Sequence, residues 1–192
     1  MDITTALKKR RSARIFKQLP VEEDKLVNMI DLARLSPSGA NLQSLKYIII
    51  TKESIRKELF PLIAYAGYIP EWNPAFEETP QAFIAVINDT KIRPTNDATQ
   101  CDSGIAMMSI CLAAYEMGYD SCMLGAIKRK EIAELLKLGE GYDLMYMIGI
   151  GVSDVENSSF DSSDEIKYEM DEKKNFKVPK RKIEDVLINK LI

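Results

Sequence analysis

Four basic side chains lie close together near the N-terminus and could bind an anion. Lys9, Arg10, Arg11 and Arg14 fall within six positions and surround Ser12. A guanidinium group binds phosphate through two parallel hydrogen bonds, and a serine hydroxyl can add another. On its own, a cluster of this kind is more often a solvated basic patch, and that simpler interpretation is favoured for these residues alone.

A second basic run, 180–182 (KRK), lies at the opposite end of the chain. A fold that brings the two runs together would let them bind one phosphate group from two sides. The second run therefore strengthens the case for an anion site, and both interpretations stay open at this point.

Segment 36–43 (SPSGANLQ) combines three polar side chains with a flexible Gly39. The side chains are Ser38, Asn41 and Gln43. Amide groups offer both donors and acceptors, which suits the edge of a heteroaromatic ring. Ser, Asn and Gly also populate ordinary helix-to-strand loops for backbone reasons, so the segment alone does not decide between the two.

Two further segments could serve a flat ligand. At Leu124 and Gly125, the glycine would let the backbone come close to a ligand and donate a main-chain N–H, although a plain turn explains it equally well. The aromatic residues Tyr68 and Trp72 could stack on a flat substrate or form a hydrophobic plug. They lie in segment 64–80, which is a candidate lid.

The composition excludes several kinds of catalysis. The chain has no histidine, which removes Ser-His-Asp and Cys-His nucleophilic systems and most catalytic zinc sites. Its three cysteines include no C-x-x-C pair, so they are expected to be core residues and no metal site is expected. The sequence contains no P-loop, G-x-G-x-x-G or G-x-S-x-G motif. If the protein is an enzyme, a bound cofactor is the natural carrier of the chemistry.

The elements that position these residues are organised around an apolar helix predicted over 97–118. It carries no charge over 103–115, and Gly118 provides a stop signal. Because apolar residues run almost all the way round, the helix must be covered by its own domain or by a second chain. Its acids Asp102 and Glu116 lie roughly 21 Å apart along a helix, too far for one acid–base pair. Capping or interface salt bridges are expected of them instead.

Strand and helix patterns alternate through the rest of the sequence. Continuously apolar runs predict buried strands, and a β-rich run predicts a third, over 82–87, 143–152 and 45–51. Amphipathic or capped patterns predict helices over 3–9, 22–35, 53–63, 128–138 and 183–191. Segment 153–174 is polar and acid-rich and is expected to be a surface excursion or partly disordered. The mixture predicts an α+β fold.

Length and charge limit the class of protein. A chain of 192 residues suits one domain, 1–192, with a real core. The net charge is −3 and the charges are mixed, so we expect no nucleic-acid surface. The N-terminus lacks an apolar secretion segment and no run has the length of a membrane span, so we expect a cytoplasmic protein without membrane association.

Four motifs, in order, resemble the nitroreductase family of FMN-dependent oxidoreductases. KRRSARIF resembles the opening R-R-S-x-R-x-F element, and LARLSPSGANLQ resembles A-x-x-x-P-S-x-x-N-x-Q. LAAYEMGY resembles the end of the family's long central helix, and PKRKIEDVL resembles its basic closing stretch. Together the motifs cover nearly the whole chain.

The resemblance implies an α+β fold with a central mixed β-sheet flanked by helices and a long buried central helix. It also implies an intertwined homodimer with FMN at the subunit interface. Contacts to the phosphate, ribityl chain and pyrimidine edge would come from Arg10, Arg11, Ser12 and Arg14. Contacts from the other subunit would come from Pro37, Ser38, Gly39, Asn41 and Gln43.

The same resemblance assigns the remaining flavin contacts. Leu124 and Gly125 would lie over the ring, with a backbone N–H near flavin N5, and Lys180 or Arg181 would close on the phosphate. Two positions depart from the family pattern. Ser44 stands where many members have proline, and segment 65–72 offers no clear Asn or Gln contact to the flavin.

The function implied is transfer of hydride from NADH or NADPH through flavin N5 to a small acceptor such as a nitroaromatic or a quinone, in a ping-pong cycle. Arg14 would tune the flavin electrostatically, with no side chain as an obligatory acid or base. A flavin-binding carrier or sensor without turnover is the alternative. A helical interaction domain without a cofactor is the third possibility.

Overall fold

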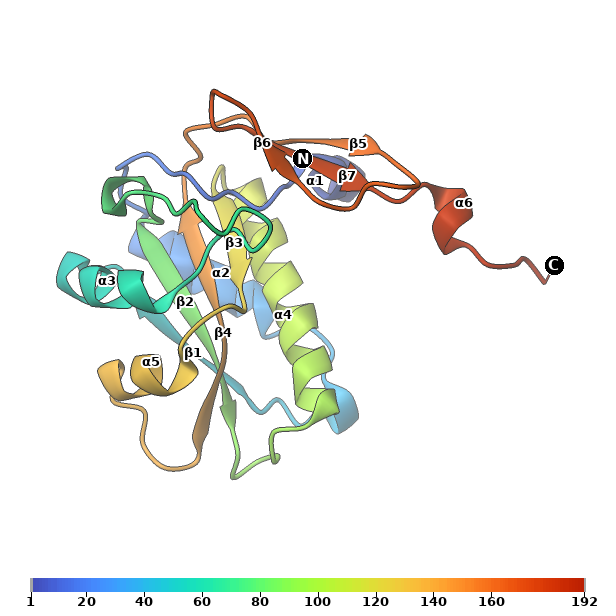
Figure 1. The fold of residues 1–192 in the computed structure, drawn as a ribbon. Coiled ribbons are helices and arrows are strands. Elements are labelled where there is room, and N and C mark those ends of the chain that lie inside the picture. Colours follow the sequence, from blue (N-terminus) through green and yellow to red (C-terminus); the bar gives the residue numbers. More distant parts are fainter. Residues whose placement is uncertain (1, 192) are drawn as a thin grey trace.

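The structure is a computed structural model that describes residues 2–191. Its centre is a four-stranded sheet in the order β1-β2-β4-β3, with the strands Leu45–Ile50, Ala82–Asp89, Tyr142–Gly151 and Asp120–Leu124 (Figure 1). All three strand pairs are antiparallel, with Leu45 opposite Asn88 and Cys122 opposite Gly149. Among the described residues, parallel pairing enters this sheet through the bridge between Ser12 and Ser121 at its β3 edge. The combination of this antiparallel sheet with several helices confirms the predicted α+β fold.

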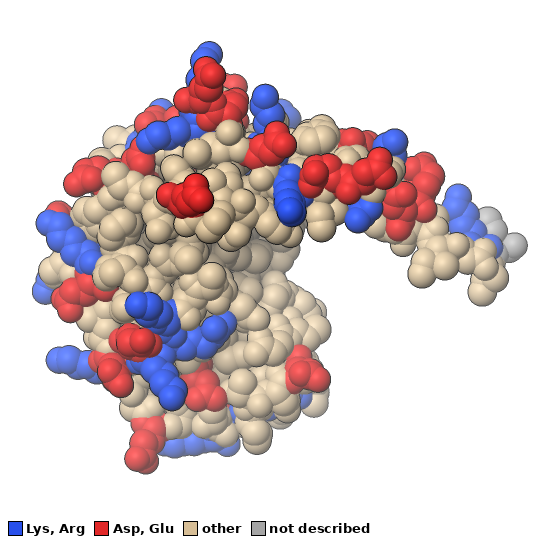
Figure 2. Space-filling view, viewed as in Figure 1, with Lys and Arg blue, Asp and Glu red and all other residues tan. Residues whose placement is uncertain are grey.

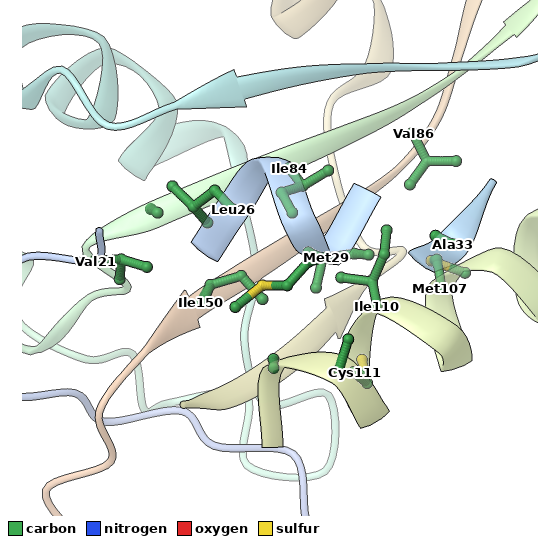
Figure 3. Packing of buried hydrophobic residues seen from close by; sticks show 14 of the residues in the cluster. Val21, Leu26, Met29, Ala33, Ile84, Val86, Met107, Ile110, Cys111 and Ile150 are labelled. Atoms are coloured by element: carbon green, nitrogen blue, oxygen red, sulfur yellow. The ribbon is translucent and has the colours of Figure 1, made fainter. Parts of the chain in front are cut away.

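Helices cover both faces of the sheet because the side chains of its inner strands alternate between two apolar faces. Ile84 and Val86 of β2 pack against helices α2 (Glu23–Ala33) and α4 (Asp97–Glu116) (Figure 3). Phe83, Ala85 and Ile87 pack on the opposite side, where α3 (Glu53–Leu59) and α5 (Arg129–Leu135) lie (Figure 1). Every residue of β2 is buried. The apolar run over 82–87 predicts this, and the strand continues through the buried polar residues Asn88 and Asp89.

Local signals place several boundaries where the sequence predicts them. Helix α1 (Ile3–Lys9) begins after Asp2, whose carboxylate accepts the N–H of Thr5 at 2.9 Å. The helix expected over 53–63 ends early, because Pro61 converts its last part into the 3₁₀ turn Phe60–Leu62. Another 3₁₀ turn, Phe76–Glu78, lies inside segment 64–80, which we call the aromatic loop.

Helix α4 is the long central helix that the apolar segment predicts. Asn96 caps its start, with Oδ1 accepting the N–H groups of Ala98 and Thr99. One face packs into the core through residues such as Met107, Ile110 and Cys111 (Figure 3). A second face is exposed or half-buried and carries an apolar stripe, which consists of Cys101, Ile105, Met108, Leu112 and Tyr115. Within residues 2–191, the expected cover of this helix is thus supplied on one side only.

The C-terminal region departs most from the sequence prediction. The acid-rich excursion is ordered into a small three-stranded sheet, made of β5 (Ser158–Asp161), β7 (Phe176–Lys180) and β6 (Glu169–Met170). The helix predicted over 183–191 is wrong in length, because α6 covers only Ile183–Val186. Beyond it the chain runs extended and away from the body as an arm (Figures 1 and 2), with Ile188 fully exposed. The apolar side chains of this segment are exposed and do not pack on the body of the protein. Because most helices in proteins are stabilised by such packing, a longer helix is not stabilised here.

Two further sequence expectations concern the cysteines and membrane-spanning helices. Cys111 and Cys122 are buried as predicted, but Cys101 is exposed on α4, so the expectation of three core cysteines is wrong for that residue. None of the helices in the described part of the chain is long and apolar enough to cross a bilayer.

Candidate functional site

Both basic runs meet at one cavity of about 140 Å³, which we call the arginine pocket. Its lining combines the N-terminal cluster with the C-terminal strand β7 and one aromatic residue of the excursion. The lining residues are Leu7, Arg10, Arg11, Ser12, Arg14, Tyr168, Val178 and Lys180. The fold therefore brings together two basic segments that lie almost 170 positions apart in the sequence, roughly the full length of the chain.

Backbone hydrogen bonds fix the N-terminal side of this pocket. The N–H of Ala13 donates to the carbonyl of Ser121 in β3 at 3.0 Å, next to the parallel bridge between Ser12 and Ser121. The N–H of Phe16 donates to Glu78 at 2.8 Å, so the segment is held along its length. The basic cluster thus lies on a rigid edge of the sheet.

The two neighbouring guanidinium groups of the pocket are used differently. Both Nε atoms, of Arg10 and Arg11, are buried without a hydrogen-bond partner. The terminal nitrogens of Arg11 donate to the carbonyls of Arg10 and Lys8, each at 2.6 Å, and to Ser159. Burial lowers the pKa of Arg11 from its ordinary value. Arg10 makes no such bonds with the described residues, so it is the group with most free donor capacity for an anion.

Arg14 is held by groups that sequence reasoning did not find. Its Nε donates to the carbonyl of Tyr65 at 2.8 Å. Its guanidinium carbon lies 4.4 Å from the ring centre of Tyr168 and 4.8 Å from that of Phe176. Such cation–π contacts favour the charged group over an aromatic face. Phe176 could have been noticed because it stands four positions before the basic run 180–182, whereas Tyr168 lies in a segment without a pattern.

The two C-terminal candidates for an anion contact separate in space. Lys180 lines the arginine pocket, but Arg181 donates to the carbonyl of Ser163 in the excursion. Adjacent residues of an extended chain point in opposite directions, which explains why both cannot face one cavity.

Segment 36–43 lines a second cavity, of about 210 Å³, which we call the loop pocket. It shares no lining residue with the arginine pocket. Its lining includes Pro37, Ser38 and Gln43 of the predicted set, but neither Gly39 nor Asn41. The other lining residues are Ala33, Arg34, Ser36, Leu45, Lys46, Tyr47, Asp102 and Ala106. Burial raises the pKa of Tyr47 to about 12.

The loop backbone adopts an uncommon shape. Ala40, Asn41 and Gln43 have φ angles of 53°, 54° and 51°, in the left-handed region that side chains other than glycine rarely adopt. The N–H of Gln43 donates to Ser38 Oγ at 3.1 Å, and its side-chain amide donates to the carbonyl of Asn41 at 3.3 Å. Non-glycine residues held in this region mark strained segments, which are common at ligand sites.

Asp102 does not cap α4 as one of the sequence expectations had it, because Asn96 does so. Its carboxylate forms a salt bridge within the chain, with Arg93 at 3.2 Å. Nothing in the sequence pattern singled out Arg93, which lies in a turn after β2.

Leu124 and Gly125 lie at the end of β3 and line neither cavity. The carbonyl of Gly125 accepts a hydrogen bond from Arg129 at 3.3 Å. Ala64, next to the Tyr65 that holds Arg14, donates to the carbonyl of Ala126 at 2.9 Å. This places the segment beside the Arg14 end of the arginine pocket.

The aromatic loop is packed down rather than open. Trp72 lies edge-on to Phe176 with ring centres 5.5 Å apart, in a cluster that also contains Ile15. Tyr68 remains half exposed and lies 5.1 Å from Tyr168. Trp72 therefore packs as the plug interpretation expects, whereas the Tyr68 side chain is half exposed. Stacking of this segment on a flat substrate stays a prediction.

Comparison with known proteins decides the family. The family model described as the nitroreductase family matches residues 7–152, about three quarters of the chain. The chain belongs to the nitroreductase family. This matched part contains the N-terminal basic cluster, the 36–43 loop and α4.

Individual proteins match the chain at modest identity. Protein DrgA of Synechocystis sp. is 28% identical over 79% of this chain and 84% of that protein. An FMN-dependent nitroreductase from Clostridium difficile R20291 superposes with a TM-score of 0.69 at 28% identity, covering 85% of this chain and 94% of that one. FMN reductase [NAD(P)H] of Bacillus subtilis is 26% identical over 71% of this chain and 60% of that protein.

Proposed function

We propose that the protein is an FMN-dependent NAD(P)H oxidoreductase that passes reducing equivalents to a small aromatic or quinoid acceptor. The arginine pocket is the observation that carries this proposal. It gathers cationic side chains from both ends of the chain around one small cavity, in a member of the nitroreductase family. Similarity to proteins named FMN-dependent nitroreductase and FMN reductase [NAD(P)H] supports it.

The donor set of the arginine pocket fits the phosphate of FMN. A phosphate monoester carries up to two negative charges and accepts several hydrogen bonds, which suits planar guanidinium forks. The two buried Nε atoms without partners, in Arg10 and Arg11, are donors left over by the protein itself. Ser12 and Lys180 add further donors to the same lining. A cavity of about 140 Å³ takes a phosphate group but not a whole flavin, so other contacts must lie outside it.

When bound, FMN supplies the two-electron chemistry, accepting hydride from NADH or NADPH at N5 and delivering it to the acceptor. The side chains of this protein provide binding and electrostatics. Arg14 is fixed by Tyr65 and two aromatic rings, so its positive charge is preorganised. A preorganised cation next to the pyrimidine edge would stabilise negative charge there without reorganisation. Leu124 and Gly125 would offer main-chain donors beside the ring.

The proposal includes a homodimer in which residues from both subunits complete each FMN site at the interface. Of the predicted flavin contacts, Arg10, Arg11, Ser12, Arg14 and Lys180 line one cavity, and Pro37, Ser38 and Gln43 line another that shares no residue with it. This separation is expected if segment 36–43 serves the flavin of the other subunit. The apolar stripe on α4 has the 4-3-4-3 spacing of a seam between helices.

The C-terminal arm supports the same assembly. The apolar residues Ile183 and Val186 of α6 and Ile188 and Leu191 of the arm are 58–100% exposed, so a monomer would leave them in water. The recess between the arm and the body is mostly free of charged side chains in the view of Figure 2. A second copy of the chain would cover both the stripe and the arm, and contiguous apolar surfaces of this kind mark interfaces.

A visible absorption spectrum of the freshly purified protein, recorded before and after anaerobic addition of NADH or NADPH, tests the proposal. A flavin spectrum that bleaches, followed by turnover with a quinone or nitroaromatic and parallel double-reciprocal lines, is the expected result. Bound flavin that neither nucleotide reduces would favour a carrier or sensor instead. A protein that takes up no FMN would exclude both and leave a cofactor-free interaction domain.

A further inference from the structure

The loop 36–43 is gripped by two side chains from outside it. Arg93 Nη1 donates to Asp102 Oδ2 at 3.2 Å, and the N–H of Gly39 donates to Asp102 Oδ1 at 2.9 Å. Arg93 Nη2 donates to the carbonyl of Gly39 at 3.0 Å. These three bonds close a ring in which both backbone polar groups of Gly39 and both carboxylate oxygens of Asp102 are used.

The ion pair lies in the interior. The side chains of Arg93 and Asp102 are 13% and 6% exposed. A buried ion pair is costly to assemble, and removal of one partner leaves an uncompensated charge. The pair is therefore unlike a simple stabilising contact. Its two hydrogen bonds to the loop are both made to Gly39, which indicates a role in fixing the conformation of that loop.

Glycine at position 39 is what lets the guanidinium group approach. A Cβ atom built on Gly39 would lie 2.9 Å from Arg93 Nη1 and 3.0 Å from Nη2, closer than such atoms normally come. The three left-handed residues of the loop, Ala40, Asn41 and Gln43, follow within four positions. Strained backbone persists only where the surroundings over-determine it, and the clamp on Gly39 supplies that restraint.

We infer that Arg93 and Asp102 are positioning residues for FMN binding. They hold the loop in the strained shape that presents Ser38, Asn41 and Gln43 to the flavin, and neither needs to touch the flavin. The inference rests on the proposed function. Because Asp102 belongs to α4 and the loop is a predicted contact to the partner's flavin, the clamp also connects the loop to the helix that carries the apolar stripe.

The test compares FMN affinity and folding in single and double variants. Asp102→Asn keeps the size of the side chain but removes its charge, and Arg93→Lys keeps the charge but removes the fork. Each is expected to raise the FMN dissociation constant about tenfold, measured by flavin fluorescence quenching at 25 °C, where circular dichroism shows the variants folded. The double variant should lose no more than the worse single variant, since both remove one restraint.

Asp31→Asn is the matched control, because it breaks the exposed pair of Asp31 with Arg34 beside the same pocket. It should leave the dissociation constant within about twofold of the wild type. Lower melting temperatures with unchanged FMN affinity in Asp102→Asn and Arg93→Lys would overturn the inference and assign the pair a structural role. A wild type that does not bind FMN would instead refute the proposed function. Additive losses in the double variant would mean that the two residues act separately, against the inference.

Discussion

The arginine pocket and the loop pocket, which each contain some of the predicted flavin contacts, differ in how far the protein satisfies its own polar groups. In the arginine pocket, two buried guanidinium nitrogens lack partners, and the guanidinium group of Arg10 makes no hydrogen bond to the described residues. In the loop 36–43, which supplies part of the loop pocket, Gly39, Asn41 and Gln43 are bonded to one another, to Ser38 or to the Arg93–Asp102 pair. One cavity has donors that await an anion, and the other has a shape that is already fixed.

This difference indicates two kinds of contribution to binding. Pairing of an unpartnered cation with an anion makes the free energy of binding more favourable. This contribution becomes smaller as salt screens charges near the surface. A rigid loop gains by losing little conformational entropy on binding, which salt affects weakly. Substitutions in the arginine pocket should therefore change the salt dependence of FMN affinity, and substitutions around the loop should change affinity without changing that dependence.

The largest effect is expected from Arg10→Ala. Loss of the guanidinium group with most free donors should raise the FMN dissociation constant about a hundredfold at low salt. The slope of affinity against salt should become shallower, because fewer charges contact the phosphate. Lys9→Ala, an exposed neighbour, should stay within about threefold. Equal losses for the two variants would show that the cluster acts only as a diffuse positive field.

Arg11→Ala sharpens the contrast inside the same pocket. Its guanidinium group connects the end of α1 to Ser159 of β5 through hydrogen bonds. Removal of this group should therefore lower the free energy of unfolding by about 1–3 kcal/mol. FMN affinity should fall less than in Arg10→Ala, by about tenfold. Melting curves of the apo-protein together with FMN titrations separate the two effects. A larger loss of affinity in Arg11→Ala than in Arg10→Ala would reverse the roles assigned here.

The two cavities can also be separated by preventing assembly. Ile105→Arg places a charge in the apolar stripe of α4 and should yield monomers in sedimentation or light scattering. If the loop serves the partner's flavin, FMN affinity should then fall about tenfold or more, although the arginine pocket is untouched. Glu58→Arg, on the exposed side of α3, is the control and should stay dimeric. Monomers with full FMN affinity would place both sets of contacts in one chain.

The sequence predicted the elements better than the details of the two cavities, for a physical reason. Capping by Asp2, the apolar run of β2 and the long helix α4 depend on local or periodic patterns, which can be read along the chain. The basic runs were also visible, and the fold does bring Lys180 to Arg10.

Long-range pairs were not visible in this way. Asp102 was expected to cap or to bridge an interface, because nothing local reveals that Arg93 folds back onto it. Tyr168 reaches Arg14 from a segment without periodicity, and only the pairing of β7 with β6 and β5 brings it there. Arg181 could not be told from Lys180, since the facing of adjacent residues depends on the register of the strand. The flavin contacts themselves stay predictions.

Gly39→Ala tests the fixed shape of the loop with a smaller expected effect. The added methyl group would meet Arg93 at 2.9 Å, so the guanidinium group must shift away from the carbonyl of Gly39. We expect FMN affinity to fall about fivefold, with an unchanged salt slope, and stability to fall by about 1 kcal/mol. Gly139→Ala is the matched control, because nothing lies within 4 Å of the added atom. A change of salt slope in Gly39→Ala would break the distinction between the two cavities.

The smallest effect concerns alkaline pH and Tyr47, which lines the loop pocket. Burial raises the pKa of Tyr47 to about 12, from about 10 in an unfolded chain. Below pH 10 the phenol is protonated in both states and has no effect. Between pH 10 and 12 the unfolded state loses the proton first, so Tyr47 makes the folded state less stable as the pH rises.

Tyr47→Phe should remove this contribution. Urea unfolding at pH 11 should then give a free energy of unfolding about 1 kcal/mol higher than that of the wild type, with no such gain at pH 8. Tyr142→Phe, a more exposed tyrosine, should leave the difference between the two pH values unchanged. If Tyr47→Phe changes the free energy of unfolding equally at both pH values, packing rather than ionisation determines the contribution of this side chain of the loop pocket.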